Sequence, residues 1–356
     1  MRLSGAGDTD ALTRMFRDDS ASSGGGGEYG VDPLFFAADD LGVPDGGSVT
    51  LSITGGDEDY EETATVDDDG MLCFQVPRQL VGSEITIIMK VKKADGTVVL
   101  SGKKTQVVEA GSQFSIVLGP EDFVQVGSIL VCIHELTQGE YETYCSYGGT
   151  SPSATYGVGP DYPAYYVSWY DALVYCNLRS MAEGLVPCYT ISGSTNPADW
   201  SGVASTGGKY RGPNSASSTW DLAECISSAN GYRLPTSDEW YQAANDGHQY
   251  SGSNFIDEVA WAGLGSDGKV HEVKTKAPNA KGIYDMSGNV WEWCWDKYGT
   301  SAHQHVTRGG CSPSGGDGTN SQVSQSWQYN SYYRDSKITG YGFVSAVGFR
   351  VVRKAD

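Results

Sequence analysis

The segment GIYDMSGNVWEW, residues 282–293, is the most distinctive part of this 356-residue chain. Its turn-forming serine, glycine and asparagine at 287–289 are followed, after Val290, by two tryptophans that are separated by one residue. We expect Trp291 and Trp293 to lie in a core, because large aromatic side chains dominate the packing of such domains. Further motifs flank this segment on both sides.

Other short motifs surround it in a fixed order: ELTQGEY (135–141), YVSWYDA (166–172) with YCN (175–177), YRLPT (232–236) with EW (239–240), RGG (308–310) and GFR (348–350). Together they resemble the formylglycine-generating enzyme (sulfatase-modifying factor) family. The resemblance covers about residues 123–356 and implies a C-type-lectin-like fold. Helix-start signals at Thr137, Ser168 and Thr236 make the expected class α+β.

Residues 32–122 follow a period-two pattern that is typical of antiparallel strands. Apolar residues alternate with polar ones, and Asp95-Gly96 is a strong hairpin signal. Several short strands without a helical period predict an Ig-like β-sandwich that precedes the lectin-like domain.

Residues 1–31 have the composition of a flexible Gly/Ser-rich tether, with four consecutive glycines at 24–27. One short helix is compatible with the pattern at 10–17. No positively charged segment followed by an apolar run opens the chain, so we expect either a cytoplasmic protein or a mature form without its signal.

The chain is strongly acidic, with 24 Lys+Arg against 44 Asp+Glu and a formal net charge of −20. We expect no nucleic-acid partner, because this charge repels phosphates. No apolar run approaches the roughly 18 residues that cross a bilayer. The 47 glycines and 22 tyrosines indicate a loop-rich protein. The eight cysteines contain no CxxC pair, and we expect most of them to be buried as small apolar side chains.

The resemblance implies that catalytic members of the family bind copper through two cysteines that follow the Gly-Gly pair. Here Cys311 directly follows Gly309-Gly310, and Ser314 and Gly316 stand where those cysteines are expected. One thiolate cannot supply the two-coordinate sulfur site that Cu(I) favours. We therefore expect a protein that is not an enzyme and requires no cofactor.

A second branch of the superfamily uses non-haem iron held by histidines. His303 and His305 would share one strand face, but the sequence offers no evident third ligand, so we interpret both as surface histidines. The alternative function is an oxygen-dependent metalloenzyme of the formylglycine-generating or sulfoxide-synthase type. A calcium-dependent carbohydrate lectin is disfavoured, because the Glu-Pro-Asn sugar motif is absent.

The family resemblance also implies a structural Ca²⁺ site. Its ligands would be main-chain oxygens around Ser287, Gly288 and Val290 together with the carboxylate of Glu292. Oxygen ligands suit Ca²⁺, although one carboxylate compensates its charge weakly. Otherwise we expect Glu292 to accept hydrogen bonds from nearby backbone N–H groups.

Residues 311–341 have the composition of a binding surface. Seven are serine, four tyrosine, four glycine, two asparagine and one tryptophan. Tyrosine and tryptophan supply rigid contact area, and the small polar residues adapt their hydrogen bonds. Because the segment precedes Gly-Phe-Arg, it resembles the variable region of ligand-binding proteins that retroelements diversify by mutating template adenines.

Such mutagenesis starts mainly from asparagine codons and yields serine, tyrosine, aspartate or glycine, but never glutamine or tryptophan. The glutamines at 322, 325 and 328 would then belong to the scaffold, and Trp327 would be a fixed aromatic anchor. The candidate ligand-binding variable positions are Ser324, Ser326, Tyr329, Asn330, Tyr332, Tyr333 and Asp335, with Ser312, Ser314, Asp317 and Asn320 as weaker candidates.

The sequence therefore predicts a non-catalytic, surface-displayed binding protein. The resemblance to variable proteins implies a lipid-anchored mature form at the outer membrane of the cell surface. Contact with the membrane would occur only through a lipid anchor that is not present in this chain. The ligand is unknown, and we expect a protein or another surface ligand.

Overall fold

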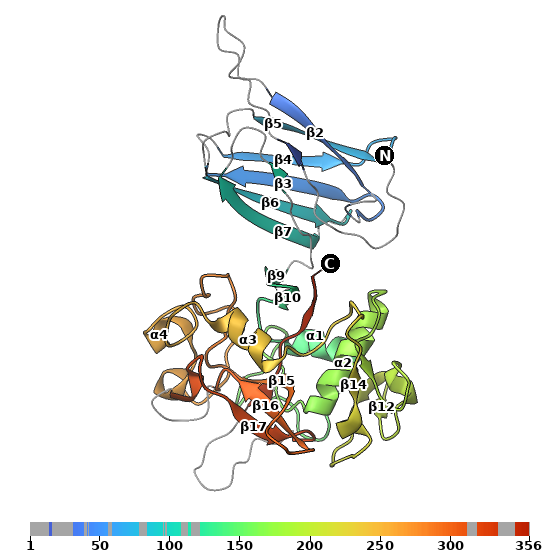
Figure 1. The fold of residues 1–356 in the computed structure, drawn as a ribbon, viewed down its shortest axis with the longest axis vertical. Helices are drawn as coiled ribbons and strands as arrows, with labels where there is room; N and C mark the ends of the chain where they lie inside the picture. The colour runs from blue at the N-terminus through green and yellow to red at the C-terminus, as the bar shows by residue number, and fades with distance from the viewer. Residues whose placement is uncertain are drawn as a thin grey trace, which may run out of the picture. The chain divides into compact units, whose positions relative to one another are not determined.

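The computed structural model describes residues 14–15, 31–38, 41, 43–55, 59–77, 84–94, 96, 98–107, 113–114, 122–311, 319–333 and 346–355. The chain divides into two compact units, with the boundary between Phe123 and Val124 (Figure 1). None of the described helices is long and apolar enough to cross a membrane.

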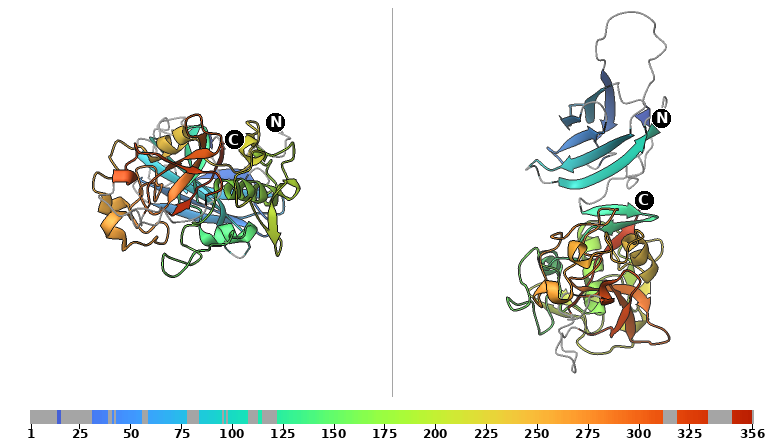
Figure 2. Two further views of the ribbon diagram at one scale, coloured as in Figure 1. Left: turned by 90° about the horizontal axis from the view of Figure 1, so that it is seen from below. Right: turned by 90° about the vertical axis from the view of Figure 1, so that its left-hand side faces the viewer.

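Two antiparallel sheets form most of the described part of the first unit (Figures 1 and 2). One pairs β2 (Val31–Ala37) with β5 (Met71–Pro77). The other has the order β4-β3-β6-β7, formed by β4 (Tyr60–Thr65), β3 (Ser48–Thr54), β6 (Glu84–Lys92) and β7 (Val98–Val107). Buried and partly buried residues alternate along β6, as the period-two pattern predicts.

Both sheets contribute to one core. Phe36 and Phe74 pack edge to face, with ring centroids 5.9 Å apart, and they share a cluster with Leu51 and Ile87 of the other sheet. Two sheets around a common core make a β-sandwich, so the predicted sandwich architecture is confirmed. The Ig-like assignment stays a prediction.

Within 1–31, the structure describes β1 (Arg14–Met15) and the first residue of β2. Arg14 pairs with Phe114 of β8 (Gln113–Phe114) in an antiparallel bridge. The short helix considered at 10–17 is therefore wrong at these two residues, which find backbone partners in a strand. The rest of the tether lies outside the described residues.

The second unit contains the helices α1 (Gln138–Tyr144), α2 (Trp169–Ala182), α3 (Ser237–Ala244) and α4 (Ile256–Val259). The first three begin at the predicted caps, Thr137, Ser168 and Thr236. Each hydroxyl accepts a hydrogen bond from the third residue of its helix, whose carboxylate accepts one from the cap N–H.

A four-stranded sheet of order β17-β16-β15-β18 organises this unit. Its strands are β17 (Trp327–Asn330), β16 (Gln304–Arg308), β15 (Trp291–Lys297) and β18 (Val347–Gly348), and β18 runs parallel to β15. A second sheet has the order β19-β10-β9, from β19 (Val352–Lys354), β10 (Ile129–Cys132) and β9 (Phe123–Val126).

Short strands and 3₁₀ turns lie between these helices and strands along the chain. β11 (Tyr189–Thr190) pairs antiparallel with the distant β14 (Glu224–Cys225), and β12 (Ala204–Thr206) forms a hairpin with β13 (Lys209–Arg211). Single 3₁₀ turns are η2 (Pro197–Asp199), η3 (Trp220–Leu222), η4 (Gly263–Ser266) and η5 (Thr319–Ser321). These pieces give the α+β, loop-rich character expected of the unit.

Aromatic side chains fill much of this core. Trp291 and Trp293 are buried, as predicted, and Trp240 of α3 packs with Cys294 and Val306 of the sheet. Six of the eight cysteines are buried, and all eight are free thiols. The cysteines therefore serve this fold mainly as small apolar side chains.

Candidate ligand-binding site

The candidate segment forms the last strand in the order of the four-stranded sheet. β17 pairs antiparallel with β16, and the register sets Trp327 opposite Thr307 and Tyr329 opposite His305 (Figure 1). A strand in this position has one side free of described strand partners, where side chains and backbone can meet a ligand.

The loop that enters β17 is exposed. Four consecutive residues, from Ser324 to Trp327, lie on the surface, and the side chain of Trp327 is 49% exposed. Asn320 in η5 is also exposed. An exposed tryptophan among serines is the kind of anchor that dominates binding energies at interfaces.

The candidates within and after β17 are less accessible. Tyr329 is only 8% exposed, because its ring stacks on Tyr333 at 4.9 Å and meets Trp293 edge to face at 6.1 Å. Asn330, Tyr332 and Tyr333 are half-buried. The geometry thus favours Tyr329 as a packing residue rather than a ligand contact. The candidates Ser312, Ser314, Asp317 and Asp335 lie outside the described residues.

Arg308, at the end of β16, holds the backbone of the exposed loop. Its Nη1 donates to the carbonyl oxygens of Gln325 at 3.1 Å and Ser324 at 3.5 Å. Its Nε and Nη2 donate to the Ser237 hydroxyl at 3.0 and 2.8 Å. Since the contacts to the loop are to backbone oxygens, they are independent of the side chains at 324 and 325.

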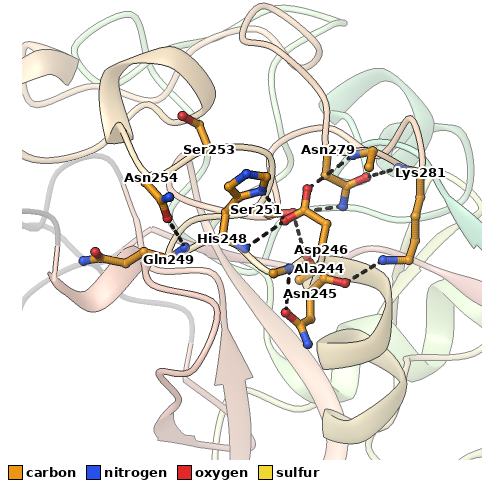
Figure 3. Close-up of polar contacts among 12 residues, drawn as sticks. Ala244, Asn245, Asp246, His248, Gln249, Ser251, Ser253, Asn254, Asn279 and Lys281 are labelled. Carbon is orange, nitrogen blue, oxygen red and sulfur yellow. Dashed lines mark hydrogen bonds and ion pairs between the residues drawn. The ribbon is translucent and has the colours of Figure 1, made fainter.

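A turn after α3 also holds this loop. The backbone N–H of Val323 donates to the carbonyl oxygen of Gln249 at 3.1 Å. Figure 3 shows that the turn is fixed by its own polar contacts, among them Gln249 N–H to the Asn254 side chain at 2.9 Å. Burial acts to raise the pKa of Asp246, but hydrogen bonds from His248 and Ala280 outweigh it and lower this pKa.

The far end of β17 is fixed by a buried aspartate. The Ser331 hydroxyl donates to Asp221 Oδ1 at 3.0 Å, and the Tyr170 hydroxyl donates to the same oxygen at 2.6 Å. The Ser331 N–H donates to the His303 carbonyl at 2.7 Å. No motif of the sequence marks Asp221, and the RGG motif marks Arg308 without indicating its role, because the partners of both residues are distant along the chain.

The two histidines considered as a metal pair have separate roles. His303 pairs through Nδ1 with Asp221. His305 is buried rather than on the surface, so the surface interpretation is wrong for it. Its ring stacks on Trp169 at 3.8 Å and its Nδ1 bonds the Trp295 carbonyl. Burial lowers the pKa of His305 to about 4.

Of the three positions considered for the copper site of catalytic relatives, the structure describes one, Cys311. Cys311 is buried, and Ser314 and Gly316 lie outside the described residues. Gly310, with φ 77°, packs so closely on Ser321 that a Cβ would lie 2.5 Å from its hydroxyl. Within the described part of the chain, no three His, Cys, Asp or Glu side chains are grouped to hold a metal.

Glu292 does not have the surroundings expected of it. Arg350 donates from Nε and Nη2 to its two carboxylate oxygens, both at 2.7 Å, and Trp240 Nε1 adds a hydrogen bond at 2.8 Å. All these side chains are buried. The carboxylate is already neutralised by a guanidinium, so it does not fit a Ca²⁺ ligand, and its partners are side chains rather than backbone N–H groups.

The other residues of the implied calcium site are engaged in the fold. Ser287 Oγ accepts from Ser251 N–H at 3.1 Å, and Val290 N–H donates to the buried Glu135 carboxylate at 2.9 Å. A Cβ on Gly288 would lie 2.4 Å from the Trp261 carbonyl oxygen. Because Glu292, the one carboxylate of the implied set, is paired with Arg350, the residues present do not fit the calcium site.

The fold and this surface define a C-type-lectin-like domain that presents an exposed loop and strand on a fixed framework. The model of the sulfatase-modifying factor enzyme 1-like domain matches residues 86–355. The chain belongs to this family, which confirms the resemblance of the motifs. The match begins within β6, upstream of the expected boundary at 123.

A solved structure and two curated proteins illustrate the similarity. Treponema denticola variable protein 1 has 26% sequence identity and a TM-score of 0.51, over 76% of this chain and 95% of that chain. The chaperone protein LppX of Paenibacillus barcinonensis is 39% identical over 160 residues, 39% of this chain and 53% of that protein. The formylglycine-generating enzyme of Thermomonospora curvata is 34% identical over 106 residues, 25% of this chain and 34% of that protein. The chain thus spans about half or less of these curated relatives.

Proposed function

We propose that the chain is a non-catalytic ligand-binding protein whose site lies in the region 311–341. The similarity to Treponema denticola variable protein 1 supports a non-catalytic use of the fold. In this proposal the retroelement diversifies the exposed positions by adenine mutagenesis. Ser324, Ser326 and Asn320 are the described candidates best placed to vary, with Trp327 as a constant anchor.

One observation carries the proposal: the exposed loop is held through its backbone. Arg308 binds two loop carbonyls, and Gln249 binds the Val323 N–H, so side chains at 324 and 326 can change without loss of these bonds. Surface substitutions of this kind usually change stability by less than about 0.5 kcal/mol. A framework of this design suits a site in which the sequence varies and the backbone does not.

The partner in this proposal is a protein or another surface ligand, bound mainly through aromatic side chains. We place the mature protein at the cell surface, where a lipid anchor would hold it to the outer membrane. Globomycin-sensitive labelling of the protein with a fatty-acid probe in its native host tests the anchor. Unlabelled protein recovered in the cytoplasm would contradict the location.

Comparison of gene copies tests the diversification directly. Several isolates should differ mainly within 311–341, at codons that correspond to adenines in a nearby template repeat. Arg308, Gln249 and Trp327 should stay constant among these copies. Differences spread evenly over the chain, or a gene without a template repeat, would contradict the proposal.

The alternative function is an oxygen-dependent metalloenzyme, favoured by the similarity to a formylglycine-generating enzyme. Metal analysis of the purified protein separates the two functions. Stoichiometric copper or iron together with oxygen consumption on a cysteine-containing peptide would support the enzyme and overturn the binding proposal. Substoichiometric metal without oxygen consumption would support the non-catalytic binding function.

A further inference from the structure

A polar cavity of about 340 Å³ lies in the second unit, outside the candidate variable region. Its walls come from the end of β11, from the turn after it, and from the chain around η3 and β14. The lining residues are Thr190, Ser192, Gly193, Ser218, Thr219, Leu222 and Glu224. The volume falls within the range of small-ligand pockets, roughly 300–1,000 Å³.

The side chains that line the cavity are mostly polar. Four side chains carry hydroxyl groups, which accept hydrogen bonds, and Glu224 adds an exposed carboxylate. Leu222 is the single large apolar member, and it is 75% exposed. The cavity therefore offers many acceptors, one negative charge and one apolar contact.

Hydrogen bonds hold the backbone of the cavity walls, although six of the seven lining residues are exposed. The Asn177 side chain donates to the Tyr189 carbonyl at 2.7 Å and accepts from the Tyr189 N–H at 3.0 Å, which fixes β11. Ser192 and Gly193 have φ values of 52° and 83° in a closed turn. A site that is already ordered loses little entropy when a ligand binds.

The opposite wall is fixed through η3. Lys297 Nζ donates to the Asp221 carbonyl at 2.9 Å, and the Asp221 carboxylate accepts from Tyr170 and Ser331. Leu222 follows Asp221 directly, so its exposed side chain stands next to a residue whose backbone and carboxylate are both held. The same aspartate ties this wall to the end of β17.

We propose that the cavity binds a primary ammonium group, such as the end of a lysine side chain on a partner. An ammonium carries three donors and one positive charge, which match the hydroxyl acceptors and Glu224. Leu222 would pack against the methylene stem. The net charge of −20 attracts cationic partners over longer distances.

Two other ligand classes fit less well. An anion would meet the Glu224 carboxylate without a cation among the lining residues. A sugar usually stacks on an aromatic ring, and none of the residues that line this cavity is aromatic. The inference is separate from the variable site, because no lining residue lies within 311–341.

Titration of the full chain with N-acetyl-lysine methylamide, followed by NMR at low salt, tests the proposal. We expect saturable binding with shifts at the cavity residues. Glu224→Gln should weaken it by roughly three- to fivefold, since exposed ion pairs are modest. Glu142→Gln removes another exposed carboxylate, on α1, and should leave the affinity unchanged.

Further variants and probes separate the apolar contribution of Leu222 from that of the ammonium group. Leu222→Ala should weaken binding of the lysine probe and leave that of methylammonium unchanged, because methylammonium has no stem. Trp327→Ala should change neither, which distinguishes this site from the variable one. Equal binding by the Nζ-acetylated probe, equal weakening by Glu224→Gln and Glu142→Gln, or preferential binding of a sugar would each overturn the proposal.

Discussion

Arg308 donates a hydrogen bond from Nη1 to the carbonyl oxygen of Gln325 at 3.1 Å. The same guanidinium binds the Ser237 hydroxyl at the start of α3, so it connects the exposed loop to the rigid core of its unit. Because this contact is to a backbone oxygen, it does not depend on which side chain stands at position 325. It is the physical reason why we expect the loop to keep one backbone path while its side chains change.

Replacing Arg308 with alanine should loosen the loop whatever its sequence. The lost hydrogen bonds should lower the free energy of unfolding by about 1–2 kcal/mol. Amide hydrogen exchange at residues 322–327 should become faster, and binding of any ligand to the loop should weaken. Lys354→Ala removes one positive charge from an exposed position in β19 and serves as the control. Unchanged exchange in R308A would show that Arg308 does not order the loop.

Substitutions at the exposed positions should be tolerated. Ser324→Tyr and Ser326→Asp should each change the free energy of unfolding by less than about 0.5 kcal/mol. Tyr329→Ala should instead cost about 3 kcal/mol, because it removes a buried ring that packs on Tyr333 and Trp293. Chemical denaturation of the three variants measures this contrast. A large loss of stability in the serine variants would contradict the prediction, because it would show that those side chains help to hold the folded structure together.

The sequence predicted the two architectures and three helix starts well, because each has a local cause. The caps at Thr137, Ser168 and Thr236 depend on residues three apart, and strand alternation depends on residues two apart. Motifs that match a known family then placed the second unit in the correct fold.

The details of the site were harder to predict, because they depend on contacts across the sheet. The composition of 311–341 marks both Tyr329 and Ser326 as candidates, but Tyr329 packs on Tyr333 and Trp293 within the fold, whereas Ser326 lies exposed in the loop before β17. The pairing of Glu292 with Arg350 spans 58 positions and replaces both roles expected for that carboxylate. Such pairings follow from the assembled fold and leave no local pattern.

The ion pair of Glu292 and Arg350 should be among the most sensitive positions for stability. Arg350→Met leaves a buried carboxylate without its cation and should cost about 3–5 kcal/mol. Changing both residues, with Glu292→Gln added, should recover part of this loss, because the uncompensated charge is then removed. Thermal unfolding of the single and double variants measures the recovery. If EDTA destabilised the native protein as much as R350M does, a bound cation rather than Arg350 would be the important partner.

Stability should also depend on pH through His305. Burial lowers the pKa of the folded imidazole to about 4, below the 6.5 of an ordinary histidine. The unfolded chain therefore binds the proton more readily, and the stabilising contribution is present above pH 6.5 and is lost as the pH falls toward 4. A difference of about two and a half pKa units corresponds to about 3 kcal/mol. His305→Gln keeps a donor for the Trp295 carbonyl but cannot titrate. It should be less stable than the native protein at pH 7, since the stack on Trp169 is lost, and should lose less stability between pH 6.5 and 4. Parallel pH profiles for the two proteins would mean that His305 does not supply this dependence.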